Sequence, residues 1–105
     1  MLDKLTSADF SAHLNQKFHI RYQPETTLEV ELIEVTKLGA EDMPGRRPFS
    51  LTFRSSQRNS YLPQHVYTLE HNQLEKMELF LVPLGPDEVG MRYEAVFTQT
   101  VDGGR

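Results

Sequence analysis

Four histidines are the residues of this chain best suited to bind a metal ion or to transfer protons near neutral pH. His65 and His71 lie six positions apart. In one continuous strand of about 3.3 Å per residue, their Cα atoms would be roughly 20 Å apart, too far to share one ion. His13 and His19 lie on different predicted elements, and the sequence contains no HxH or HExxH spacing. We therefore expect no metal site, and we interpret the histidines as surface or structural residues.

Glu29 and Glu31 form a carboxylate pair of the kind used in glycoside hydrolysis. On one face of a strand their Cα atoms would lie about 7 Å apart. They alternate with a regular apolar face, as in an ordinary solvated strand, and the sequence has no tryptophan to serve as a sugar platform. The sequence also lacks a serine nucleophile elbow and a glycine-rich phosphate loop. No catalytic constellation is present, so we expect a protein that is not an enzyme.

A basic segment contains four arginines: Arg46, Arg47, Arg54 and Arg58. From Met43 to Leu69 there is no acidic residue, so this segment carries +4, while the other 7 basic and 15 acidic residues give −8 and a total of −4. The acidic total argues against nucleic acid as the main partner. The arginines are candidates to bind a carboxylate or phosphate. The alternative is that the arginine pair at 46–47 belongs to a solvated loop and that the basic segment only packs beside the acidic strands of the fold.

The elements that position these residues are mostly strands. A short helix comes first, with Thr6 or Ser7 as its cap and Leu5, Phe10 and Leu14 as its apolar stripe. Apolar and polar residues then alternate in six segments, at 17–22, 26–35, 49–54, 66–70, 77–82 and 91–97. This order predicts a mainly β fold: about six mostly antiparallel strands rolled into a small barrel or half-open roll, with the short N-terminal helix at one end.

Two local signals refine this fold. The apolar phase slips between Leu32 and Ile33, which indicates either a β-bulge or the end of one strand. The segment from Gly85 to Gly90 has the residues of a tight turn, so the strands on either side of it should form a hairpin.

Phe80 and Val82 do not follow the one-sided pattern of the other strands. Their segment is apolar on nearly both faces and should end at Pro83. If no other element covers them, they form an exposed apolar patch that marks a subunit contact. If the helix or another strand covers them, they are a second layer of the core.

Length and composition indicate a single domain, with a β-roll over residues 1–99 and a flexible tail over 100–105. The 105 residues include no cysteine, which excludes disulfides and thiolate metal sites. No apolar run approaches the roughly 20 residues that cross a bilayer. The N-terminus lacks the basic and apolar regions of a signal peptide, so we expect a cytoplasmic protein that does not bind membranes.

The segment YLPQHVYTLEHNQLEKMELFLVPLGPDEVGMRYEAVF, together with ELIEVTKL and RRPFSLTFR, resembles a family of small bacterial domains of unknown function. The resemblance covers nearly the whole chain except its tail. It implies similarity to proteins found beside phage-tail-collar-like fibre proteins, and hence a structural or assembly role. It carries over no catalytic residue. Gln64, Arg92 and Glu94 are the polar residues in these motifs that packing does not obviously require.

Together these observations predict a non-enzymatic protein-interaction or assembly module that needs no cofactor. It would self-associate, or dock on a larger protein such as a fibre, through Phe80 and Val82. One alternative is a binding domain for a small anionic ligand that uses the arginines. Another is an enzyme of unrecognised type that uses a histidine and a carboxylate such as His71 and Glu94 for acid–base chemistry, which requires the two groups to lie within hydrogen-bond reach in a cleft.

Overall fold

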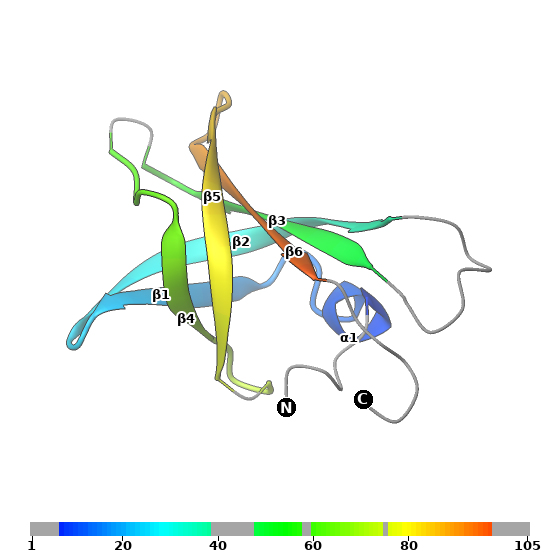
Figure 1. The fold of residues 1–105 in the computed structure, drawn as a ribbon. Coiled ribbons are helices and arrows are strands. Elements are labelled where there is room, and N and C mark those ends of the chain that lie inside the picture. Colours follow the sequence, from blue (N-terminus) through cyan, green and yellow to red (C-terminus); the bar gives the residue numbers. More distant parts are fainter. Residues whose placement is uncertain (1–6, 39–47, 58–59, 75, 98–105) are drawn as a thin grey trace.

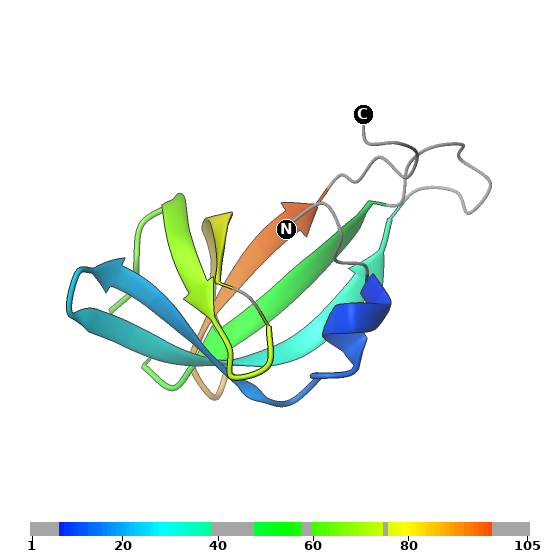
Figure 2. The same ribbon diagram turned by 90° about the horizontal axis from the view of Figure 1, so that it is seen from below.

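The computed structural model describes residues 7–38, 48–57, 60–74 and 76–97. These residues form a short helix and six strands that close into a barrel (Figures 1 and 2), which confirms the predicted fold class. The elements are α1 (Ser7–Ser11), β1 (Lys17–Gln23), β2 (Thr26–Lys37), β3 (Phe49–Ser55), β4 (His65–Glu70), β5 (Met77–Pro86) and β6 (Met91–Phe97). No helix in these ranges is long and apolar enough to cross a membrane.

The strands follow the order β1-β2-β3-β6-β5-β4 around the barrel, and all neighbours are antiparallel. The β5–β6 hairpin forms as predicted. The pairings β3–β6 and β1–β4 join segments that are distant in sequence. The β1–β4 seam, which closes the barrel, runs only from His19↔Glu70 to Arg21↔Thr68.

β2 contains the predicted bulge. Its register with β3 shifts between Leu32 and Glu34, so Ile33 is the extra residue, and the strand continues beyond it to Lys37. The ribbon of β2 curves as it passes from β1 to β3 (Figure 2). Because of this bend, one strand of 12 residues can pair with β1 on one edge and with β3 on the other in a closed barrel.

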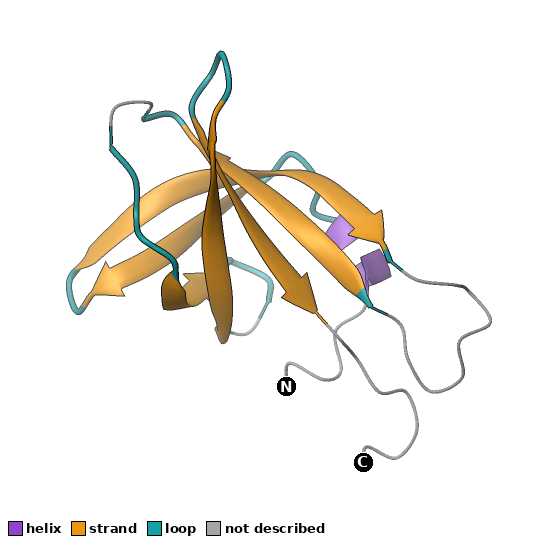
Figure 3. Ribbon diagram, turned by 45° about the horizontal axis from the view of Figure 1, so that its top comes forward, coloured by secondary structure: helices purple, strands orange, loops and turns teal. Residues whose placement is uncertain are grey.

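The core lies inside the barrel, and α1 covers one end of it (Figures 2 and 3). Phe10 of α1 is fully buried, and its ring centroid lies 5.8 Å from that of Phe49 and 5.5 Å from that of Phe97. The predicted helical stripe was wrong at Leu14, which is 40% exposed. The reason is that α1 ends at Ser11, so Leu14 lies beyond the helix, and Leu5 lies outside the described residues.

β5 does not end at Pro83 as predicted, and it runs on to Pro86. Its first half, Met77–Leu81, pairs with β4, whereas its second half, from Val82 onward, pairs with β6. Proline has no backbone N–H to donate to a neighbouring strand, so it is tolerated where one edge of its strand is unpaired. Pro83 lies in the half of β5 that no longer pairs with β4, so the strand continues through it.

Candidate functional site

The outer face of β4 and β5 carries an apolar patch formed by Val66, Phe80 and Val82. Val66 and Phe80 are direct cross-strand partners. Their side chains are 49% and 53% exposed, and Val82, next on the same face of β5, is partly exposed. The described elements therefore leave Phe80 uncovered, and the second-core-layer interpretation of this residue was wrong.

Two glutamates flank the apolar patch. Glu78 precedes Phe80 on the same face of β5, and Glu94 of β6 is the cross-strand partner of Val82. Within the described residues neither carboxylate forms an ion pair. The site therefore has an apolar centre with a carboxylate on either side, and Arg92, two residues before Glu94 on the same face of β6, adds a positive charge near one of them. An apolar side chain flanked by basic groups could contact the centre and the two carboxylates.

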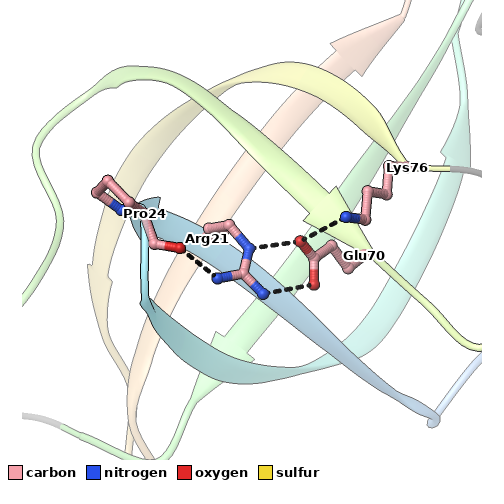
Figure 4. Close-up of polar contacts among 4 residues, drawn as sticks. All are labelled: Arg21, Pro24, Glu70 and Lys76. Atoms are coloured by element: carbon pink, nitrogen blue, oxygen red, sulfur yellow. Dashed lines mark hydrogen bonds and ion pairs between the residues drawn. The ribbon is translucent and has the colours of Figure 1, made fainter.

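A different charge cluster fastens the seam between β1 and β4 (Figure 4). Arg21 Nε donates to Glu70 Oε2 at 2.6 Å, and Arg21 Nη2 donates to Oε1 at 3.3 Å. Arg21 Nη1 also donates to the carbonyl oxygen of Pro24 at 2.9 Å, and Lys76 Nζ lies 3.9 Å from Glu70 Oε2. The hydrogen bond from Arg21 lowers the pKa of the Glu70 carboxyl. The guanidinium of Arg21 and the carboxylate of Glu70 are bonded to each other, so this pair has a structural role and does not offer a free charge to a ligand.

Of the four predicted arginines, only Arg54 lies in the described residues. Arg54 Nη1 donates to Asp87 Oδ2 at 3.0 Å, which leaves this guanidinium engaged. Arg46, Arg47 and Arg58 lie outside the described residues. The anion-binding prediction therefore gains no support from the part of the chain that the structure describes.

Two of the histidines meet, a contact that the sequence analysis missed. The ring centroids of His13 and His71 are 4.5 Å apart. Gln16 Oε1 lies 3.0 Å from His13 Nδ1 and 2.9 Å from His71 Nε2, and the Gln73 backbone N–H donates to His71 Nδ1 at 3.0 Å. Since an amide oxygen only accepts hydrogen bonds, both ring nitrogens facing Gln16 are donors. Burial, and then His13, lower the pKa of His71, which favours its neutral form.

This histidine pair does not form a recognisable catalytic or metal site. No group of three metal-ligating residues occurs in the described ranges. His71 uses its ring nitrogens for Gln16 and Gln73, and it has no hydrogen bond to Glu94. His71 and Glu94 therefore do not form the acid–base pair that the sequence suggested.

A family model described as a domain of unknown function (DUF6916) matches residues 5–97. The match reaches from just before α1 to the last residue of β6. It agrees with the resemblance to small domains of unknown function. Comparison with curated proteins and with solved structures gave no match.

Proposed function

The chain belongs to the DUF6916 family of domains of unknown function, and from its surface we propose that it is a protein-docking module. The observation that carries the proposal is the apolar patch. Val66 and Phe80 face each other across two paired strands, and each is about half exposed. Aromatic side chains with apolar neighbours are typical of the centre of protein interfaces.

The charges around the patch favour a partner that is a different protein. If two copies met patch to patch about a twofold axis that runs along or across the line from Glu78 to Glu94, the carboxylates of the two copies would face each other. Like charges opposed in this way disfavour association. We therefore propose a partner with an apolar anchor and basic residues at its rim. The fibre or tail-like protein implied by the family resemblance is one class of partner to test first.

In the experiment, the wild-type chain and variants of the apolar patch are each immobilised, and the proteins that each one retains are compared. Phe80→Glu places a charge at the centre of the patch. Val89→Glu is the matched control, because Val89 is also about half exposed but lies in the β5–β6 turn. We expect a protein retained by the wild type and by Val89→Glu, and lost with Phe80→Glu. Glu78→Lys combined with Glu94→Lys should weaken the same retention through charge reversal.

Light scattering behind size exclusion distinguishes the possible occupants. We expect a wild-type monomer. A wild-type oligomer that Phe80→Glu converts to folded monomer would show that a second copy occupies the patch. Equal retention by the wild type and Phe80→Glu would exclude the patch as the docking surface. If Phe80→Glu does not fold, Val66→Glu tests the same face.

A further inference from the structure

Backbone hydrogen bonds fix the connection between α1 and β1 to the wall of the barrel. The Asn15 N–H donates to the Leu32 carbonyl oxygen at 2.7 Å, and the Leu32 N–H donates to the Gln16 carbonyl oxygen at 3.1 Å. The start of β1 and the end of β4 lie side by side at the β1–β4 seam (Figure 2). The Gln16 side chain therefore reaches His71, the first residue after β4, from an anchored backbone.

His71 joins two connections through its two ring nitrogens. Its Nδ1 accepts the Gln73 backbone N–H at 3.0 Å within the β4–β5 connection, and its Nε2 donates to Gln16 Oε1 at 2.9 Å in the α1–β1 connection. A backbone N–H can only donate and an amide oxygen can only accept, so Nδ1 has a free lone pair and Nε2 carries the hydrogen. The two hydrogen bonds together therefore require the neutral imidazole.

A proton added to His71 removes one of these hydrogen bonds. The proton binds at Nδ1, which then becomes a donor and can no longer accept the Gln73 N–H. The charged ring would also lie beside His13, at a centroid distance of 4.5 Å, and would line the same surface cavity as Lys17 of β1. A contact with the ring of Phe18, also at 4.5 Å, offsets part of this cost.

The surroundings of His71 favour its neutral form. Glu70 precedes it, but that carboxylate is bonded to Arg21, and Glu75 lies outside the described residues. Burial, and then His13, lower the pKa of His71 below its ordinary value of 6.5. Its contribution to stability is therefore fully present above pH 6.5 and declines as the pH falls below this value, because the unfolded chain takes up the proton first.

We propose that His71 is a pH-sensitive switch between the α1–β1 and β4–β5 connections. In its neutral form it joins Gln16 to Gln73. When it gains a proton, the bond from the Gln73 N–H breaks, and the two connections loosen at this end of the β1–β4 seam. Histidine changes its charge between about pH 5 and 8, so the switch responds to mild acidification. The proposal does not depend on the docking function.

The test is an NMR titration of the full chain from about pH 8 to about pH 5, which follows the imidazole nitrogens and the backbone amides. At the upper end we expect His71 as the Nε2–H tautomer, which the ¹⁵N shifts of its ring nitrogens report. His71 should gain its proton at a midpoint below pH 6.5, and the Gln73 amide signal should shift with the same midpoint. The heteronuclear ¹H–¹⁵N NOE of residues 13–16 and 71–73 should fall as this happens.

Three variants separate the switch from a purely structural role. His71→Asn removes the titration but keeps an acceptor, because an asparagine side chain can accept the N–H two residues ahead, so the NOE of residues 71–73 should no longer depend on pH. Gln16→Glu places a carboxylate where both histidines donate, so the midpoint of His71 should rise. His65→Asn is the matched control, since it changes an exposed histidine of β4, and it should leave the Gln73 titration unchanged.

Three results would overturn the proposal. A midpoint of His71 at or above pH 6.5 would mean that the fold does not disfavour its charged form. A Gln73 amide signal that does not follow the titration of His71 would mean that their hydrogen bond does not break. An equal fall of the NOE in the wild type and in His71→Asn would mean that another group loosens the connections. If His71→Asn does not fold, the wild-type titration decides the question. Phe80→Glu should titrate as the wild type does, which separates this test from that of the docking function.

Discussion

Asp87 organises the β5–β6 turn with a single carboxylate. Its Oδ1 accepts the backbone N–H groups of Gly90 at 2.9 Å and Val89 at 2.8 Å, and its Oδ2 accepts a hydrogen bond from Arg54. These donors favour the charged form and lower the pKa of Asp87 from 3.8 to about 2, with the backbone hydrogen bonds contributing most. The folded state therefore binds a proton at Asp87 less readily than the unfolded chain does.

Asp87 should make stability depend on pH in the acidic range. Its contribution is fully present above pH 3.8 and is lost as the pH falls toward about 2, because the unfolded chain takes up the proton first. We expect Asp87→Asn to reduce the free energy of unfolding at neutral pH and to flatten its decline below pH 3.8, as measured by urea unfolding across pH. Glu88→Gln, which changes an exposed neighbour, should keep the wild-type slope. An unchanged slope in Asp87→Asn would contradict this assignment.

At the residue scale the sequence could not reveal which side chains meet. The separation argument for His65 and His71 addresses only residues on one strand. His71 instead meets His13 through the β1–β4 seam, which places the end of β4 beside the start of β1. The same limit applies to Tyr93: its position in strand alternation predicts burial, but its bond to the Leu62 N–H depends on where the β3–β4 connection lies.

At the scale of elements, the β5–β6 hairpin is held against the end of β3 by a close backbone approach at Gly90. A Cβ atom placed on Gly90 would lie 1.6 Å from the carbonyl oxygen of Ser55. Neither atom belongs to a flexible side chain, so one of the two segments must shift to accommodate it. Glycine at this position is therefore required by sterics and not by its backbone angles.

Gly90→Ala should lower the free energy of unfolding by about 3 kcal/mol, because two backbone segments must separate. Gly85→Ala is the informative comparison. Its Cβ would meet nothing within 4 Å, but its φ of 112° is unfavourable for a side chain, so we expect a loss of about 1–2 kcal/mol. Urea unfolding measures both losses. A Gly90→Ala protein as stable as Gly85→Ala would show that the two segments can move apart at little cost.

Elements whose alternation is regular could be predicted from the sequence. β6 alternates as expected, and the slip at Ile33 correctly located the bulge in β2. β3 forms where expected, but Ser50 and Thr52 on its polar face are buried as well. β5 was predicted too short, because a proline usually ends a strand and the sequence does not show that the pairing partner changes there. The helix was predicted too long, because Leu14 has helical spacing from Phe10 although α1 ends at Ser11.

At the scale of the whole molecule, the barrel keeps its features apart. α1 covers one end, and the apolar patch lies on the outer wall of β4 and β5. The wall is least extensively paired at the β1–β4 seam, where only Ile20↔Leu69 and its two flanking pairs join the strands. This seam forms only when two segments about 50 residues apart in the chain meet. Contacts between residues close in sequence do not bring such segments together.

The Arg21–Glu70 pair should therefore control local opening of the barrel. Arg21 and Glu70 lie on opposite sides of the seam and share two hydrogen bonds, so Arg21→Ala should speed amide hydrogen exchange in β1 and β4 while β2 and β3 stay protected. Lys17→Ala is the control, since Lys17 is an exposed residue of β1 that lies outside the β1–β4 pairing. Faster exchange in every strand at once would mean that the barrel opens as one cooperative unit. No change in β1 and β4 would mean that the core residues Ile20 and Leu69 hold the seam without the ion pair.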